Sequence, residues 1–508
     1  MTDVTGTVDR SPVVRISADV TADRGDRVYA AARDATDSVP IVRTGPTGSR
    51  KLEPLVLATD GGRTAFFYSA SSSDARELAT ELESGTFPTS HADAVVEHDP
   101  DTPSLPVPET GPLSVGHRRV LGPCGWIDPL EPADYALCST EQQDVSVAAQ
   151  TGVLARGRGD AVADQPAANA WTTARDTDGD PVVVVNAHET DDRQQADRTL
   201  LASAPIAVLD GVAAVASFVG AEDAVIYLNE RETALQQHVR QAVDAVKDVL
   251  PVVPDVVAGP DEYRAGSPTA ALEAMEGADR IEPRLQPPTP AQYGLYGRPT
   301  VVHTPRTVAQ LQRAMRSPPS FDADAPDPGT RLVTVTGDVD VPAVVELDAG
   351  TELAVARDAV SMDGSFKMAC VGGVFGGITT ELDLAPTAQS LTAAGLGTDG
   401  VVELLNDDRC AVATAGERAR FASQANSGRC VPGREGTKQL TELLRELYQG
   451  SFRSDDIREL GRVMTRSSNC QIGEYAPRPV VTAIDEFEPE FRVHADGQCP
   501  SGTCSTQL

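Results

Sequence analysis

The segment 427–474 constrains the fold more than any other, because it holds two amphipathic helices with a cysteine beyond each outer end. Leucines at helical spacing predict the first helix over 437–448. The second helix is predicted to begin at Ser454, which we expect to cap it, with two aspartates in its first turn. Two such helices joined by a short turn form an antiparallel hairpin, so Cys430 and Cys470 should be neighbours in space.

This arrangement resembles the iron–sulfur region of the complex I flavoprotein subunit, the NADH-oxidising and FMN-binding subunit, and of its relatives in NAD-linked hydrogenases and formate dehydrogenases. Members of that family have the motif C-G-x-C-x-P-C-R-E-G, followed by a helical hairpin and the motif F-C-P-x-G-D. In the family, four thiolates from these motifs bind one [4Fe–4S] cluster. Here Ser427 and Gly433 stand at the first and third cysteine positions, so only Cys430 and Cys470 match ligands. On the residues alone, these two could also be ordinary thiols buried for packing.

Length and charge narrow the class of protein. At 508 residues the chain is too long for one core, and about 100–200 residues per domain predicts three to five units. A formal net charge of −32, with lysine far rarer than arginine, is typical of a halophilic protein, because molar salt shortens the Debye length to about 3 Å. The same charge, without any basic cluster, argues against binding to nucleic acid.

The apolar segments predict the compartment. The first residues, 1–6, show no signal pattern, and the most apolar stretch, 204–228, is interrupted by acidic residues. We therefore expect a cytoplasmic protein with no direct membrane span. Its eight cysteines should then be mainly reduced thiols or metal ligands.

Residues 1–100 are predicted to form a small α/β layer. The predicted elements are a helix at 27–35, a strand at 41–43, a hairpin over 55–68 and a helix at 74–82. Their order resembles the thioredoxin-like [2Fe–2S] domain of fused relatives, with the motif T-G-C-x-G-x-C-x-x-E-P. Pro46 and Arg50 stand at its two cysteine positions, so we expect the fold without its cluster. Residues 86–112, rich in proline and acids, are interpreted as a linker.

Residues 113–328 resemble the flavoprotein α/β domain of the family. The family's phosphate loop reads R-G-G-A-G-F-P-T-G-x-K-W, and its glycines let backbone N–H groups approach a phosphate. This chain keeps Arg158 and Gly159 of that loop, but Asp160 and Asp164 would face the phosphate with like charge. These replacements make FMN binding doubtful.

A strand predicted over 182–185 runs into a second matched motif. Asn186, Glu189 and Asp191 fit the family's N-A-D-E-G-E turn. The resemblance implies that these side chains hold the flavin ring and ribityl chain. On the residues alone, a solvated acidic loop or helix cap is the commoner explanation in so acidic a chain.

The nucleotide segment of the family is matched only in part. Gly259 and Gly266 agree with it, whereas Ser267 and Pro268 replace the paired glutamates that contact nicotinamide nucleotide, so NAD binding is doubtful as well. The following segment, 283–300, is nearly unaltered and is the most specific resemblance in the chain. Its prolines and glycines are structural, because they fix an extended path and permit close turns.

The last units are shorter. Alternating apolar residues over 331–353 predict strands that resemble the family's ubiquitin-like β-grasp insert, here 329–394. A helical iron–sulfur-binding-region domain follows at 395–486, and its Cys410 matches a common family position that is not a ligand. The whole chain is thus predicted to be an α/β and α+β multidomain protein with a C-terminal helical bundle.

The tail, 487–508, carries C-P-S-G-T-C from Cys499 to Cys504, which resembles the start of a ferredoxin extension in some relatives. These two cysteines could fold back and complete a four-thiolate metal site with Cys430 and Cys470. Closing a loop of roughly thirty residues costs only a few kcal/mol, which metal–thiolate binding of about 10 kcal/mol would offset. The alternative is a disordered tail with two idle thiols.

The resemblance covers about residues 13–504 and implies an NADH dehydrogenase flavoprotein-subunit-like protein that works with other subunits of an electron-transfer complex. Ligand cysteines, loop glycines and nucleotide-contacting glutamates are replaced while structural residues persist. The alternative is therefore a non-catalytic structural or assembly partner that keeps only the fold. We expect a [4Fe–4S] cluster to be possible and FMN and NAD to be doubtful.

Overall fold

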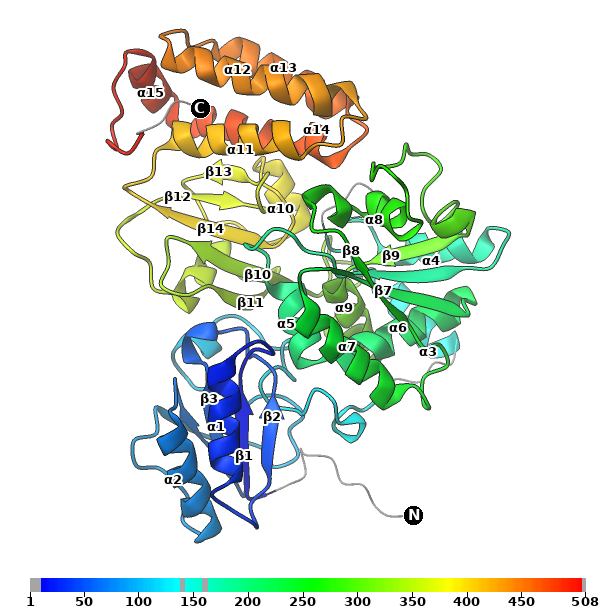
Figure 1. Ribbon diagram of the computed structural model, residues 1–508, viewed down its shortest axis with the longest axis vertical. Coiled ribbons are helices and arrows are strands. Elements are labelled where there is room, and N and C mark those ends of the chain that lie inside the picture. The colour runs from blue at the N-terminus through cyan, green and yellow to red at the C-terminus, as the bar shows by residue number, and fades with distance from the viewer. Residues whose placement is uncertain (1–10, 138–141, 158–162, 505–508) are drawn as a thin grey trace.

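The computed structural model describes residues 11–137, 142–157 and 163–504. Three β-sheets and a helical bundle make up these ranges (Figure 1). The N-terminal sheet lies at one end of the molecule and the bundle at the other, with a second five-stranded sheet between them and a four-stranded sheet beside it. This confirms the predicted mixed α/β multidomain class, whereas the limits of the individual domains stay predictions.

The N-terminal sheet has the strand order β2-β1-β3-β4-β5, and only β1 and β2 run parallel. Its elements are β1 (Val13–Ser17), α1 (Asp23–Arg33), β2 (Ile41–Thr44), β3 (Leu55–Asp60), β4 (Arg63–Phe67), α2 (Ser72–Glu83) and β5 (Ala94–Glu97). Alternate residues of β3 point to opposite faces of the sheet and pack into two different cores. Val56 packs with residues of α1 and α2, and Leu57 packs with Trp126 on the opposite face. Strand β5 lies inside the segment 86–112 that was predicted as a linker. The sequence did not predict it because an edge strand of four residues is too short to show a clear alternation of apolar and polar residues.

The four-stranded sheet is parallel, with the order β8-β7-β6-β9. Its strands are β6 (Val182–Asn186), β7 (Asp223–Asn229), β8 (Asp255–Gly259) and β9 (Thr300–His303). Its helices are α3 (Gln142–Gln150), α4 (Ala167–Asp176), α5 (Ala196–Ser203), α6 (Pro205–Val219), α7 (Thr233–Val246), α8 (Pro268–Met275) and α9 (Pro305–Arg316). The strand order reverses between β6 and β9, and such switch points form ligand crevices at the carboxyl ends of strands.

The apolar segment from 196 to 219 forms two helices. Helices α5 and α6 meet at a 98° bend, because Pro205 lacks the N–H that would continue α5. In the described part of the chain, no single helix has both the length and the apolar character needed to cross a bilayer. Only this bent pair, taken as one, passes that test, and almost all of α6 is buried in the protein core.

The second five-stranded sheet has the order β11-β10-β14-β12-β13. Its elements are β10 (Thr330–Gly337), β11 (Ala343–Asp348), β12 (Phe366–Val371), β13 (Gly377–Thr379), α10 (Ala388–Ala393) and β14 (Val401–Asn406). Strand β14 is central in this sheet although it lies past residue 394, the predicted end of the unit. It pairs in parallel with β10 and antiparallel with β12, so it joins the sheet by long-range contacts that periodicity does not reveal.

The bundle covers one side of this sheet (Figure 1). Its helices are α11 (Ala411–Ala425), α12 (Thr437–Tyr448), α13 (Ser454–Ser467), α14 (Gln471–Tyr475) and α15 (Arg478–Ala495). Helices α12 and α13 form the predicted hairpin around Leu440, Leu444 and Ile457. Ser454 is the first residue of α13 and not its cap: the N-cap position belongs to Arg453, which makes no side-chain cap bond.

Candidate functional site

The residues matched to the flavin contacts lie at the carboxyl end of β6, beside the switch point. Asn186 donates through Nδ2 to the carbonyl of Gly266 at 2.9 Å. Glu189 accepts two backbone N–H groups of its own turn, and Asp191 accepts from the guanidinium of Arg193 at 2.8 Å and from the N–H of Val374 at 3.0 Å. The turn is therefore held by its own polar contacts. Arg158 and Gly159, predicted for the phosphate loop, lie outside the described residues.

Gly259, the other predicted nucleotide residue, ends β8 against an aromatic ring. A Cβ at this position would lie 1.8 Å from the hydroxyl oxygen of Tyr227, so the glycine is required by packing. Tyr227 in turn stacks on His188, with ring centroids 5.0 Å apart, and His188 contacts the carbonyl of Pro260 through Nε2 at 2.8 Å. His188 stands where the matched motif has an aspartate, so an aromatic stack fills part of the crevice.

The cavity at this switch point measures about 30 Å³. It is bordered by Asn186, Glu189 and Gly266, and by the side chain of Arg306, which forms ion pairs with Asp197 at 3.4 Å and with Asp399 at 3.3 Å. Ordinary ligand pockets measure about 300–1,000 Å³. This cavity by itself is smaller than an ordinary ligand pocket, but Gly157 and Ala163, which border it, also line a second, larger cavity.

A buried ion cluster borders the same crevice. Asp327 pairs with both Arg156 and Arg331, and all three side chains are at most 5% exposed. Burial alone would raise the pKa of Asp327, but the two guanidinium groups hold it below its usual range. Asp164, which was expected to oppose a phosphate, faces the same two arginines at 3.7 and 3.5 Å. Its charge is therefore used in the protein's own ion cluster.

A larger cavity of about 790 Å³ lies between the crevice and the bundle. The segment around Asp164 lines one side, and Arg466, Arg478 and Gln471 line the other. Tyr263 and Phe375 meet edge to face at its border, with centroids 5.6 Å apart. The cavity thus combines aromatic and cationic walls beside the cysteines of the hairpin.

Cys430 and Cys470 meet as the hairpin predicts, with their Sγ atoms 3.0 Å apart. Each sulfur also accepts a backbone N–H at 3.3 Å, from Gly433 and from Gly473 respectively. The hydrogen bond from Cys470 lowers the pKa of Cys430 to about 5, and the same bond raises the pKa of Cys470. The two thiols are therefore unequal, and Cys430 is the more acidic of the pair.

The predicted four-thiolate set is not assembled in one place. Cys499 and Cys504 lie with Cys410 and His494, whereas Cys430 and Cys470 belong to no group of three or more potential metal ligands within the described ranges. Of the two alternatives for the tail, the structure shows the one in which it folds back, but it reaches Cys410 and the loop after β14 and not the Cys430–Cys470 pair. With only two sulfurs at the family's cluster position, the described residues do not fit a four-point [4Fe–4S] cluster.

Cys410 and His494 are the two members of the new group that were not predicted from the sequence. His494, Cys499 and Cys504 are spaced H-x₄-C-x₄-C, and such short His/Cys tracts are a signal of metal binding. Cys410 lies 84 residues before His494, so only the fold could add it to the group.

The parallel sheet with a polar switch point, the second sheet and the cysteine-bearing bundle define a multidomain α/β fold. Residues 151–313 match the family model described as the Nuo51 FMN-binding domain, and residues 413–494 match the NADH-ubiquinone oxidoreductase-F iron-sulfur binding region. The chain belongs to the family of NADH-quinone oxidoreductase F subunits, the flavoprotein subunits of complex I.

Individual relatives support this membership. The F 2 subunit of NADH-quinone oxidoreductase from Rhizobium meliloti is 30% identical, over 68% of this chain and 87% of its own. The NADP-reducing hydrogenase subunit HndC of Solidesulfovibrio fructosivorans is 26% identical, over 76% of this chain and 85% of its own. A chain of an air-oxidized NAD+-reducing [NiFe]-hydrogenase has the same fold, with a TM-score of 0.66 and 22% identity, over 96% of this chain and 86% of that one.

These matches bear on the cofactor predictions. The chain contains the iron–sulfur binding region and the FMN-binding domain of the family. The comparisons therefore lend no support to the expectation that FMN and NAD binding are doubtful. The small cavity is a separate, geometric observation.

Proposed function

We propose that this chain is the flavoprotein-type subunit of an NADH:acceptor electron-transfer complex and works there with other subunits. One observation carries the proposal: the hydroxyl of Ser267 donates to Oε1 of Gln471 at 2.9 Å. Ser267 stands in the segment matched to nicotinamide contacts, and Gln471 follows Cys470 directly. The segment matched to nicotinamide contacts thus touches the residue after Cys470, and a short electron path between the nucleotide position and the iron–sulfur region would require such a contact.

In this role the residues at the flavin and nucleotide positions would be Asn186, Glu189, Asp191, Gly259 and Gly266, together with Arg158 and Gly159 of the phosphate loop. Their match to the family supports the assignment. It requires a wider crevice than the 30 Å³ between Asn186 and Arg306. A direct measurement of bound flavin is therefore part of the test.

The test uses the full chain, affinity-tagged and purified from its own host at high salt. We expect it to elute with partner subunits in fixed stoichiometry, and the assembly to reduce ferricyanide with NADH. Elution as a single chain without partners, or an assembly that transfers no electrons from NADH, would overturn the proposal. A cytoplasmic location is proposed with it, because the seven cysteines that the structure describes form no disulfide with one another, as in a reducing compartment.

A second candidate is a structural subunit that keeps the fold without the redox groups. The small cavity and the two-sulfur cluster position favour it. Flavin released by acid from the purified assembly separates the two candidates. About one FMN per chain supports the redox subunit, and flavin far below one per chain supports the structural subunit.

A further inference from the structure

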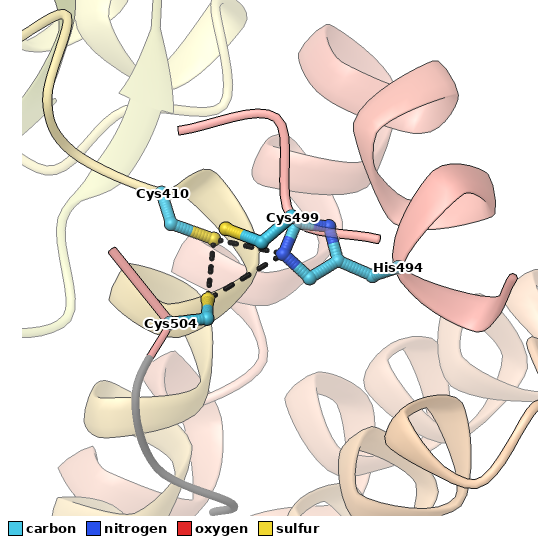
Figure 2. A group of neighbouring side chains, drawn as sticks. All are labelled: Cys410, His494, Cys499 and Cys504. Atoms are coloured by element: carbon cyan, nitrogen blue, oxygen red, sulfur yellow. Dashed lines mark hydrogen bonds between the residues drawn. The ribbon is translucent and has the colours of Figure 1, made fainter. Parts of the chain in front are cut away.

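Four metal-binding side chains converge at the C-terminal end of the described chain (Figure 2). Cys410 is the N-cap of α11, His494 lies near the end of α15, and Cys499 and Cys504 follow in the tail. Their ligand atoms all lie within 4.8 Å of one another. Cys410 and His494 are buried, and the two tail cysteines are partly exposed. Solvent therefore reaches the group only on the side of the tail.

The histidine is oriented as a ligand. Nδ1 of His494 lies 2.7 Å from the carbonyl of Glu490, which can only accept, so Nδ1 carries the proton and the lone pair sits on Nε2. That nitrogen faces the sulfurs of Cys410 at 3.3 Å and of Cys504 at 3.4 Å. A carbonyl bound to the far nitrogen is the usual second contact of a histidine that binds metal.

The spacing of three of the four ligand atoms, those of Cys410, Cys504 and His494, suits one tetrahedral ion, and the Cys499 sulfur lies within 4.8 Å of all three. Bonds of about 2.3 Å to sulfur and 2.0 Å to nitrogen place a sulfur and a nitrogen about 3.5 Å apart, and two sulfurs about 3.8 Å apart. The two nitrogen–sulfur distances in the structure agree with this expected spacing to within about 0.2 Å. The Cys410 and Cys504 sulfurs lie 3.1 Å apart, so their separation must increase by about 0.7 Å when the ion binds. Thiolates of a [4Fe–4S] cluster bind four separate irons and lie farther apart, so this group is too compact for one.

The surrounding contacts position the ligands from three elements. The sulfur of Cys410 accepts the N–H of Ala413 at the start of α11, which fixes the position of the sulfur. The sulfur of Cys504 lies 3.6 Å from the hydroxyl of Tyr448 on α12, and the hydroxyl of Thr503 donates to the carbonyl of Asp408 at 2.9 Å. An ion at the centre would therefore join the tail, the bundle and the loop after β14.

We propose that Cys410, His494, Cys499 and Cys504 bind one Zn²⁺ ion in a closed, structural Cys₃His site. Three thiols lose their protons when the ion binds, and no coordination position is left for substrate. Zn²⁺ has no redox chemistry, so this site takes no part in electron transfer. Its role is to fix the tail and the end of α15 to the N-terminus of α11. The proposal is independent of the proposed function.

The test measures metal in the full-length chain purified without added chelator. We expect about one zinc and no matching iron or sulfide at this site. The variants Cys499→Ser and Cys504→Ser should lose it. Cys470→Ser is the matched control, because its thiol belongs to the hairpin pair, and it should keep the zinc. A chain free of zinc, zinc lost only in Cys470→Ser, or an iron–sulfur chromophore lost in Cys504→Ser would overturn the proposal.

A second measurement does not depend on how the variants fold. In the wild-type chain, alkylation followed by mass spectrometry should show Cys499 and Cys504 protected, and both should become labelled after a strong chelator is added. Replacing zinc by Co²⁺ should give the intense visible bands of tetrahedral cobalt–thiolate, and these should be absent in Cys504→Ser. Equal labelling of both cysteines before and after chelation would contradict the site.

Discussion

Replacing Asp327 with asparagine should destabilise the junction between the four-stranded unit and the sheet that contains β10. The Asp327 carboxylate is 3% exposed and neutralises two guanidinium groups, those of Arg156 and Arg331, which are 5% and 4% exposed. It also accepts the N–H of Ala388 at 2.8 Å. An asparagine has nearly the same shape but no charge, so it removes the neutralisation and leaves most packing in place.

The size of the effect follows from the burial of the two arginines. Removing one partner of a buried ion pair costs about 3–5 kcal/mol, because the other charge stays buried without compensation. Asp164 faces the same arginines at 3.7 and 3.5 Å and compensates part of the loss, while the second unpaired guanidinium adds to it. We therefore expect the free energy of unfolding of this region to fall by about 3–5 kcal/mol.

Native-state amide exchange along β10 is the assay, because the protection of its N–H groups reports the free energy of local opening. The control is Asp324→Asn, an exposed aspartate of the same loop, which should change that free energy by less than about 0.5 kcal/mol. Equal effects of the two variants, or a loss below about 1 kcal/mol for Asp327→Asn, would refute the reasoning.

The pH dependence has a definite sign. Because the pKa of Asp327 is lowered in the folded protein, its contribution is fully present above the unfolded pKa of about 3.9 and is lost as the pH falls through the folded value. The difference between wild type and Asp327→Asn should thus be constant from about pH 5 to 8 and shrink below about pH 4. A difference that grows on acidification would contradict the assignment.

Three further outcomes are expected. Glu346→Gln should cost about 1–3 kcal/mol in thermal melts, because its buried carboxylate accepts hydrogen bonds from three donors, whereas the exposed Glu352→Gln should be near neutral. With a pKa of about 5, Cys430 should be alkylated at a rate that is nearly flat from about pH 6 to 8, measured by mass spectrometry. A rate that rises about tenfold per pH unit would show an ordinary thiol. The double variant Ser427→Cys, Gly433→Cys should take up a [4Fe–4S] cluster on anaerobic reconstitution, which its visible absorption would show and the unchanged chain would lack.

Local patterns in the sequence predicted much of this structure. Leucine spacing located α12 from Thr437 to Tyr448, and the short turn after it brought Cys430 and Cys470 together. Both inferences need only neighbouring segments of the chain. The valine run of β6 likewise predicted a buried strand whose end carries Asn186.

Features that depend on distant segments could not be predicted in this way. Strand β14 enters its sheet between β10 and β12, and Cys410, which follows that strand, meets His494 only after the sheet and the bundle pack together. Sequence spacing carries no information about such a contact across 84 residues. The H-x₄-C-x₄-C tract was visible, but its fourth ligand was not.

The cysteine pair shows how one replacement has two structural effects. Gly433 removes a ligand position, which the sequence already indicates. In the folded chain, a Cβ at Gly433 would also lie 2.9 Å from the sulfur of Cys470 and 3.2 Å from that of Cys430. The first of these distances is shorter than any ordinary contact of a Cβ atom. Without that side chain, the two sulfurs lie 3.0 Å apart and form a hydrogen bond. The loss of the third ligand and the contact of the remaining two are therefore a single packing event, and restoring the cysteine should separate the pair.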